Sequence, residues 1–274
     1  MDWWRLQHVQ QACRLLWTQR RFLWLLSKND LSNRYAGSMA GVLWAYVQPI
    51  LTIAAYWLVF DFIFELKVGN NSGNASRMGA YLVAGSVPWL AFCDATLRGT
   101  HALVDASALV QKSAIPPSLV ISRSVLASCI TFGPLLLLLP LAYIRGATGA
   151  SFLAYGAVPF LVLCQFALSL LLSHILAVFS AALRDMLQIT AFSLSLGIYL
   201  TPVFFPITLF PEAWRWILYL NPMTALVMSY QSVFLYSVWP PAEQWAVTGG
   251  WILALVFFLE PVLARSKNEL VDWL

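Results

Sequence analysis

The sequence predicts an all-α integral membrane protein, with about six transmembrane helices, an N-terminal amphipathic interfacial helix, and re-entrant helices before the last span. The chain of 274 residues is 60% hydrophobic and only 10% charged, with a mean hydropathy of +0.73. Soluble domains carry roughly 25% charged residues, and here too little polar sequence remains to coat a soluble core. Long apolar runs alternate with short basic connectors. Backbone polar groups must pair inside a bilayer, so such runs must be helical.

Residues 1–38 form a cytoplasmic interface segment of a different kind. Apolar side chains recur near helical spacing opposite polar ones, although Arg20 interrupts the apolar side. Such a helix lies in the membrane interface rather than crossing it; the alternative is an ordinary amphipathic helix docked on protein. We recognise no cleavable signal peptide, because the early apolar patch Phe22–Leu26 is too short for one. The apolar side comprises Trp3, Leu6, Val9, Cys13, Leu16, Trp17 and Trp24, opposite Gln7, Gln11, Arg14 and Thr18.

Residues 39–274 form the predicted transmembrane domain, in which run length places the spans. A seventh apolar region, Phe210–Val238, is broken by Pro211, Asn221 and Pro222, so that each half is too short to cross. We predict re-entrant helices there, because broken backbone is tolerated at membrane depth only where protein or a water-filled cavity receives it. The alternative is a loop on the outer surface. The predicted spans are Gly41–Phe64, Gly79–Leu97, Leu119–Ile144, Phe152–Ala181, Leu187–Phe205 and Val247–Ala264.

The distribution of basic residues predicts the orientation. Most of the 16 Lys and Arg residues precede the first span or fall in alternate connectors and the tail. By the positive-inside rule both termini are cytoplasmic, and an even number of spans agrees. The cytoplasmic set is Arg5, Arg14, Arg20, Arg21, Lys28, Arg34, Arg98, Lys112, Arg123, Arg184, Arg265 and Lys267, and the outer set is Lys67, Arg77, Arg145 and Arg215.

Motifs for catalysis are missing from the sequence. There is no G-x-x-x-x-G-K-[ST] loop, no H-E-x-x-H spacing and no G-x-S-x-G elbow, and the four cysteines are scattered singly. Acidic residues in the spans are the usual sign of proton or ion coupling; here they are Asp61, Asp94 and Glu260. For all three, a structural role is at least as well supported as a relay role, and Asp94 has the i,i+4 spacing to Arg98 that permits a helical ion pair.

Several motifs together resemble one family. The stretch Asp30–Trp44 (DLSNRYAGSMAGVLW), followed by Gln48-Pro49, is similar to the approach to the first span in ABC-2 type permeases. These permeases export polysaccharides such as O-antigen, capsule and teichoic acid, and their pattern reads roughly R-Y-x-x-S-x-L-G-x-x-W, with Ala40 here replacing the leucine. Where the family often has Tyr-Arg, this chain has Tyr230-Gln231. Further matches in the family's order are Arg184-Asp185, Tyr199–Pro206 (YLTPVFFP), Phe210-Pro211-Glu212 and Leu220–Thr224 (LNPMT).

The resemblance implies a transport subunit that is not itself an enzyme. It implies a homodimer bound to two copies of a separate ABC ATPase, which would bind ATP and Mg, with no cofactor in this chain and no nucleic acid partner. The connector His101–Ser118 would hold the coupling helix that docks into the ATPase; the alternative is a solvated loop. The contact or shaping residues would be Asp105, Gln111, Lys112, Pro116 and Pro117.

Glycan export implies two further groups of residues. A sliding polymer needs a lining that binds weakly and repeatedly, which aromatic faces provide, although aromatic residues on spans more often pack or face lipid. An undecaprenyl-pyrophosphate carrier would be attracted by Lys28 and Arg34, of which Arg34 can contact phosphate bidentately; anchoring to anionic membrane lipid is the alternative. The lining candidates are Trp44, Tyr46, Tyr56, Trp57, Phe60, Tyr199, Phe204 and Phe205.

These observations predict a multi-pass permease of a bacterial inner membrane that exports lipid-linked polysaccharide. O-antigen is the first choice of cargo, with capsular polysaccharide or teichoic acid as alternatives. A secondary small-molecule transporter would need coupling charges near the bilayer midplane and usually repeated halves, and neither is apparent. A membrane-bound glycosyl or acyl transferase would need a catalytic cluster in loops that are here short and poor in His and Asp.

Overall fold

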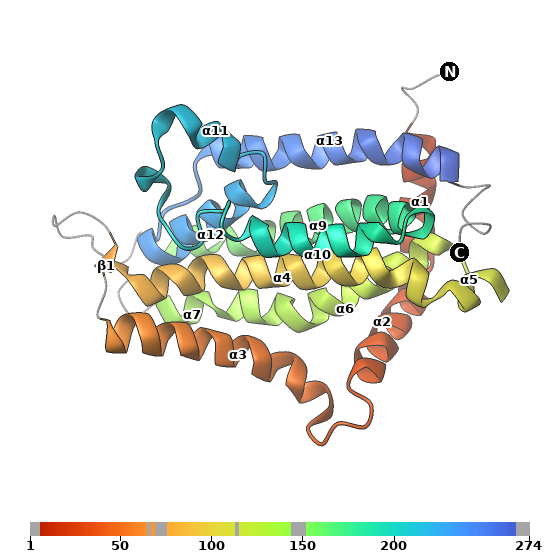
Figure 1. Ribbon diagram of the computed structural model, residues 1–274, viewed down its shortest axis with the longest axis horizontal. Coiled ribbons are helices and arrows are strands. Elements are labelled where there is room, and N and C mark those ends of the chain that lie inside the picture. Colours follow the sequence, from red (N-terminus) through yellow and green to blue (C-terminus); the bar gives the residue numbers. More distant parts are fainter. Residues whose placement is uncertain (1–5, 65–66, 69–75, 113–114, 144–151, 267–274) are drawn as a thin grey trace.

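The computed structural model describes residues 6–64, 67–68, 76–112, 115–143 and 152–266, and these are almost entirely helical (Figure 1). Strand β1 (Lys67–Val68) pairs antiparallel with β2 (Ser76–Arg77). Trp3, Arg5, Ser113, Ala114, Ile144, Arg145 and Lys267 lie outside the described residues. The helices are α1 (Gln7–Thr18), α2 (Arg20–Arg34), η1 (Gly41–Leu43), α3 (Trp44–Tyr56), the π-helix η2 (Trp57–Ile63), α4 (Met78–Asp105), α5 (Ser107–Lys112), α6 (Pro117–Leu138), α7 (Pro140–Tyr143), α8 (Phe152–Tyr155), α9 (Val158–Ala182), α10 (Asp185–Gly197), η5 (Ile207–Leu209), η6 (Glu212–Trp214), α11 (Arg215–Leu218), α12 (Met223–Tyr236) and α13 (Ala242–Ser266).

Five helical stretches within the described residues are long and apolar enough to cross a bilayer, so the chain is an all-α integral membrane protein. The stretch expected at Leu187–Phe205 differs, because α10 has 13 residues and ends at Gly197, fewer than the roughly 20 that a span needs. Pro202 lacks an N–H and disfavours helical backbone in the residue before it, so the helix does not resume. The five are Gly41–Ile63, Met78–Asp105, Pro117–Leu138, Leu153–Ala182 and Ala242–Ser266.

Helix α4 is the centre of the bundle, with α3, α6, α9, α10 and α12 packed around it (Figure 1). Small residues at four-residue spacing let α4 and α9 approach closely, as is common between membrane helices. Ser173 donates a hydrogen bond to the Ala95 carbonyl at 3.4 Å across this contact, and Ser180 donates to the Thr100 carbonyl at 2.7 Å. The small residues are Ala91, Ala95 and Gly99 on α4 and Ser169, Ser173, Ala177 and Ala181 on α9, all buried.

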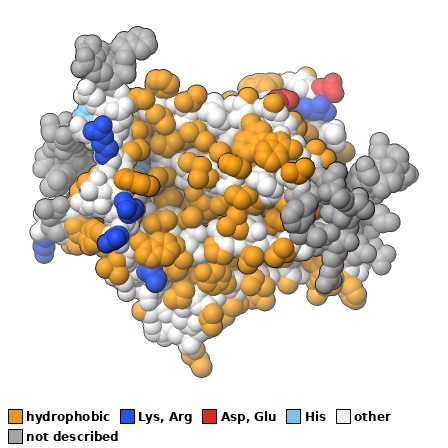
Figure 2. Space-filling model, turned by 180° about the vertical axis from the view of Figure 1, so that it is seen from behind, with side chains coloured by type: hydrophobic (Ala, Val, Ile, Leu, Met, Phe, Trp, Pro, Cys, Tyr) orange, Lys and Arg blue, Asp and Glu red, His pale blue; other side chains and the backbone are white. Residues whose placement is uncertain are grey.

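Two of the spanning helices lie at the periphery. Only 11% of the most apolar window in Gly41–Ile63 and 17% of that in α13 is buried, against 72% for α4. Their exposed apolar surfaces must therefore face lipid or another chain. Figure 2 shows hydrophobic side chains across the broad middle of the molecule, with Lys and Arg gathered towards one end. That end carries α1, α2 and α5 in Figure 1, and we call it the α2 end; the opposite end is the β1 end.

Two acidic residues of the spans cap other helices. Asp61, in η2, accepts a hydrogen bond from the backbone N–H of Gly79 at 2.7 Å, in the first turn of α4. Glu260, in α13, accepts from the backbone N–H groups of His8 and Val9, both at 3.0 Å, in the first turn of α1. A carboxylate pairs with the free N–H groups of a helix start and complements the helix dipole. Both side chains therefore have structural partners, and Glu260 holds α1 against the last span.

Candidate functional site

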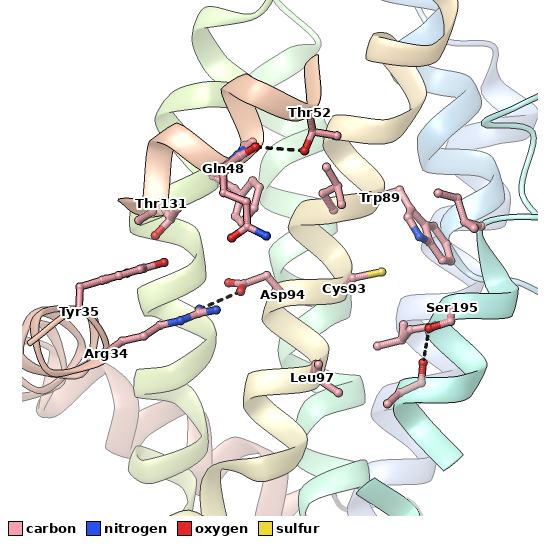
Figure 3. A pocket seen from close by; sticks show the side chains of 17 residues that line it. Arg34, Tyr35, Gln48, Thr52, Trp89, Cys93, Asp94, Leu97, Thr131 and Ser195 are labelled. Carbon is pink, nitrogen blue, oxygen red and sulfur yellow. Dashed lines mark hydrogen bonds and ion pairs between the residues drawn. The ribbon is translucent and has the colours of Figure 1, made fainter. Parts of the chain in front are cut away.

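A groove runs along α4 between α3 and α10. It contains a hollow of about 370 Å³ that is lined by all three helices, by α6 and by the end of α2. Figure 3 shows Gln48 and Thr52 entering from α3, Trp89 and Asp94 from α4, and Ser195 from α10. A smaller set on α3, from Trp44 to Tyr56, lines a second, shallower hollow that continues from the first. The groove lies on the exposed side of the protein, so a substrate or a second chain can reach it.

Polar side chains are exposed in this groove at membrane depth. Gln48 and Ser195 are exposed, and Thr52, one turn beyond Gln48, donates to the Gln48 carbonyl at 3.0 Å. An amide that faces hydrocarbon without compensation is costly, so the groove is suited to water, a polar ligand or a protein partner. These residues were not among the predicted lining residues. Their i,i+4 spacing on an apolar span was the available signal.

Aromatic side chains gather at the β1 end of the groove, and we call Tyr56, Phe60, Tyr199 and Phe204 the aromatic rim. Ring centroids are 6.5 Å apart for Tyr56 and Phe60, and 5.6 Å for Tyr199 and Phe204. The first pair lies on α3 and the π-helix η2, and the second lies in the segment after α10. Four of the eight predicted lining residues thus form two aromatic pairs on elements distant in sequence.

The other four predicted lining residues lie outside the aromatic rim, and Trp44 alone among them lines the hollow along α3. Trp44 is exposed at the α2 end of α3. Tyr46 packs against α6, and its hydroxyl donates to the Ile130 carbonyl at 3.3 Å. Trp57 is 53% exposed and stacks on Phe62 of its own π-helix. Phe205 stacks on Phe210, at 6.1 Å between centroids.

Five charged residues form an ionic cluster at the α2 end of the groove: Asp30 and Arg34 of α2, Asp94 and Arg98 of α4, and Arg123 of α6. Arg34 donates to Asp94 at 3.0 Å, and Arg98 lies 3.4 Å from Asp30. The predicted Asp94–Arg98 pair is confirmed at 3.7 Å, the same distance that separates Arg123 from Asp30. The cluster ties α2 to the bundle. The contacts of Arg98 and Arg123 with Asp30 were not predicted, because no local spacing connects these arginines to α2.

Arg34 lies between two hollows, since it lines both the 370 Å³ hollow of the groove and a third hollow of about 470 Å³ towards the α2 end. Burial lowers the pKa of Arg34, but the hydrogen bond and negative charge of Asp94 outweigh it, so its pKa rises above the usual value. The guanidinium therefore stays charged at any physiological pH. Lys28 is exposed on α2 and is not among the residues that line either hollow.

The connector after α4 folds into the short helix α5 at the α2 end (Figure 1). Val110 buries itself in an apolar cluster between α4, α6 and α9, which fixes α5 on the bundle. Asp105, Gln111 and Lys112 remain exposed. Pro116 precedes α6 and Pro117 begins it, the position where proline suits a helix start.

Comparison with known proteins identifies the family. A family model described as ABC-2 type transporter matches residues 21–235, which is most of the chain. The chain belongs to the ABC-2 type transporter family. It is also 28% identical to an O-antigen export system permease protein of Myxococcus xanthus, over 94% of this chain and 97% of that protein. Two O-antigen export system permease proteins of Klebsiella pneumoniae are 22% and 21% identical, over 77% and 78% of this chain and 79% and 80% of theirs.

The matched region of this ABC-2 transporter runs from α2 to α12 and so includes every helix that lines the groove. Family membership makes the chain a multi-pass membrane subunit for transport and implies an ABC ATPase as its partner. Among the described residues no three His, Cys, Asp or Glu side chains form a metal-binding group. At the position where the family often has arginine, Gln231 donates to the Pro202 carbonyl at 2.8 Å.

Proposed function

We propose that this chain is the transmembrane subunit of an ATP-driven exporter that moves lipid-linked O-antigen polysaccharide across the inner membrane, from the cytoplasmic to the outer side. The observation that carries this proposal is the Myxococcus xanthus relative, whose similarity extends over nearly the whole of both chains. Matching over full length, rather than in one motif, supports a shared cargo class as well as a shared fold.

The groove has the chemistry that a sliding glycan needs. Its exposed polar groups, such as Gln48 and Ser195, offer hydrogen bonds to sugar hydroxyls. The aromatic rim offers ring faces on which sugars pack without a fixed register. Neither feature gives a single tight site, and this favours movement of a polymer over capture of a small molecule. Trp44, which lines the hollow along α3, would add another ring face. The predicted lining residues Tyr46, Trp57 and Phe205 would take part only if a partner chain or a conformational change brings them to the groove.

The exposed side of α3 supports assembly with a second copy of this chain. A groove on one protomer is half of a conduit, and two copies that face one another would exclude lipid from the polar side chains. Two ABC ATPase subunits would bind ATP and Mg and dock on the end of α4 and on α5, through Asp105, Gln111 and Lys112, with Pro116 and Pro117 fixing the turn into α6. Residues 1–38 would lie in the cytoplasmic interface, and residues 39–274 would form the transmembrane domain with both termini cytoplasmic.

The ionic cluster is placed to meet the diphosphate of the lipid carrier. Arg34 lines both the hollow of the groove and the hollow towards the α2 end, and its guanidinium can make a bidentate contact with a phosphate. In the present arrangement it pairs with Asp94, so a diphosphate would take over the bond that Asp94 now makes. Lys28, exposed on the same helix, would add attraction without direct contact.

Deletion of the gene followed by cell fractionation tests the function. We expect lipid-linked glycan to accumulate on the cytoplasmic side while the cell surface loses it, and its sugars would tell O-antigen from capsule or teichoic acid. Surface glycan that is unchanged, in a strain without a redundant exporter, would refute the proposal and favour a small-molecule transporter. Restoration with Arg34→Ala should fail or be weak; full export with intact carrier binding would exclude the diphosphate role.

A further inference from the structure

The chain after α10 is irregular backbone inside the protein. Helix α10 ends at Gly197, and Thr201, Pro202 and Val203 are buried. Carbonyl groups released by the end of a helix must find donors, because an unpaired polar group at membrane depth is costly. The donors that reach this segment come from α4, from α12 and from the loop before α12.

Two side chains converge on the same carbonyl. The Tyr81 hydroxyl of α4 lies 2.9 Å from both the Pro202 and the Phe205 carbonyl oxygens, and its one proton can serve either. The Gln231 amide of α12 donates to the Pro202 carbonyl at 2.8 Å. Tyr81 is 3% exposed and Gln231 is 5% exposed, so water does not compete for these bonds.

A second pair of contacts holds the beginning of the segment. Asn221 donates through its side-chain amide to the Thr201 hydroxyl at 2.7 Å, and Thr201 donates to the Gly197 carbonyl at 2.7 Å. The Asn221 carbonyl oxygen in turn accepts the N–H of Met223 at 3.0 Å, in the first turn of α12. The segment is thus fixed at both ends to α4 and α12.

The central helix leaves room for this arrangement. A Cβ added at Gly85 would lie 2.9 Å from the Gln231 amide nitrogen and 3.3 Å from the Val203 Cα. A Cβ added at Gly197 would lie 2.7 Å from the Trp89 ring. Both distances are shorter than normal van der Waals contacts, so α4 meets the segment as closely as glycine allows.

The carbonyls that Tyr81 and Gln231 hold belong to the same short segment as two side chains of the aromatic rim. Tyr199 is 64% exposed, and Phe204 packs against it. We propose that Tyr81 and Gln231 are positioning residues that hold Pro202 and Phe205, and thereby fix Tyr199 and Phe204 so that the rim closes the β1 end of the conduit. This inference rests on the proposed function, because it assigns a task to the rim of that same conduit.

The test compares two buried glutamines that make the same kind of bond. Gln231→Met keeps the side-chain length but loses the donor. The matched control is Gln165→Met, because Gln165 is fully buried and donates to the Pro88 carbonyl at 2.9 Å, on another face of α4. Tyr81→Phe, which removes only a hydroxyl, is a milder second variant. Each full-length chain is assembled with its ATPase partner in liposomes, and ion leak without ATP is measured beside thermal unfolding.

We expect Gln231→Met to raise the rate of ion leak about tenfold. A tenfold change corresponds to 1.4 kcal/mol, which is within the range of free energies that leaving a buried polar group unpaired costs. Tyr81→Phe should also raise the leak, because the Phe205 carbonyl then loses its donor, and Gln165→Met should leave it within about twofold. Unfolding temperatures should fall similarly for the two Gln→Met variants. A leak equal to that of the unsubstituted protein in both Gln231→Met and Tyr81→Phe would overturn the positioning role. Failure of the proposed function would show separately, as surface glycan that persists in the deletion strain.

Discussion

Gly99 offers the sharpest test of the packing between α4 and α9. In Gly99→Ala the new Cβ would lie 2.3 Å from both the Cβ and the Oγ of Ser173, and 3.2 Å from a methyl group of Val125. Carbon atoms pack at about 3.5–4.0 Å, so the two helices would have to separate by about 1 Å. The Ser173 Cβ is bonded to the α9 backbone, so no change of rotamer relieves the clash.

The magnitude follows from two opposing terms. Overpacking costs about 1–3 kcal/mol, and this clash belongs at the upper end because it is backbone-anchored on both sides. Alanine is better than glycine in a helix by about 1 kcal/mol. The net expected loss in the free energy of unfolding is therefore about 2 kcal/mol.

Reversible unfolding of the purified protein in mixed micelles measures this loss. Gly249→Ala in α13 is the matched control, because a Cβ there has nothing within 4 Å, and it should be neutral or up to about 1 kcal/mol stabilising. Equal stability of the Gly99→Ala and Gly249→Ala proteins would show that the helices yield without cost and would refute the packing argument.

Three further outcomes are expected. Replacing Glu260 by Leu should speed amide exchange at His8 roughly 5- to 30-fold, because the helix start loses a cap of about 1–2 kcal/mol; hydrogen-exchange mass spectrometry measures it. Asp61→Ala should lower the free energy of unfolding by about 1 kcal/mol, because the Gly79 N–H loses its partner; micelle unfolding measures it. Lys112→Glu should reduce ATP-driven export about tenfold through charge reversal at the ATPase contact, at unchanged unfolding temperature.

Each of these has a matched variant. Glu243→Gln changes an exposed carboxylate on the same helix as Glu260 and should leave amide exchange in α1 as it was. Asp61→Asn keeps an acceptor oxygen and should recover much of the stability lost by Asp61→Ala. Lys112→Arg keeps the charge and should preserve export. Amide exchange at His8 that is as slow in the Glu260→Leu protein as in the unsubstituted protein would contradict the cap. Full export by Lys112→Glu would contradict the ATPase contact at Lys112.

Most of the spanning helices could be predicted from the sequence, because the thickness of the bilayer determines how many apolar residues a spanning helix needs. The sequence was insufficient for the chain after α10. The apolar run through Phe205 predicts a continuous helix, whereas Pro202 and the buried donors Tyr81 and Gln231 stabilise a break instead. Apolar content alone does not distinguish a long span from a short helix followed by satisfied irregular backbone.

Contacts between distant elements limited the prediction of the site. The Asp94–Arg98 pair was predictable from a local spacing and is present. The bond from Arg34 to Asp94, and the caps that Asp61 and Glu260 provide, join residues that no periodicity connects. For the same reason the hydrogen bond from Tyr46 to the Ile130 carbonyl of α6 was not foreseeable, although Tyr46 was selected for its chemistry.

The polar side of α3 has a consequence for biosynthesis. Gln48 and Thr52 leave the ribosome long before Asp185, where the other wall of the groove begins. At about 5–20 residues per second, the intervening chain takes on the order of 10 s to make. During that interval the first span must stay in the bilayer by its own hydropathy, while its amide is turned to lipid or to the insertion machinery. The polar side chains of a newly made chain are thus least shielded from lipid when the first helix has entered the membrane and α10 has not yet been made.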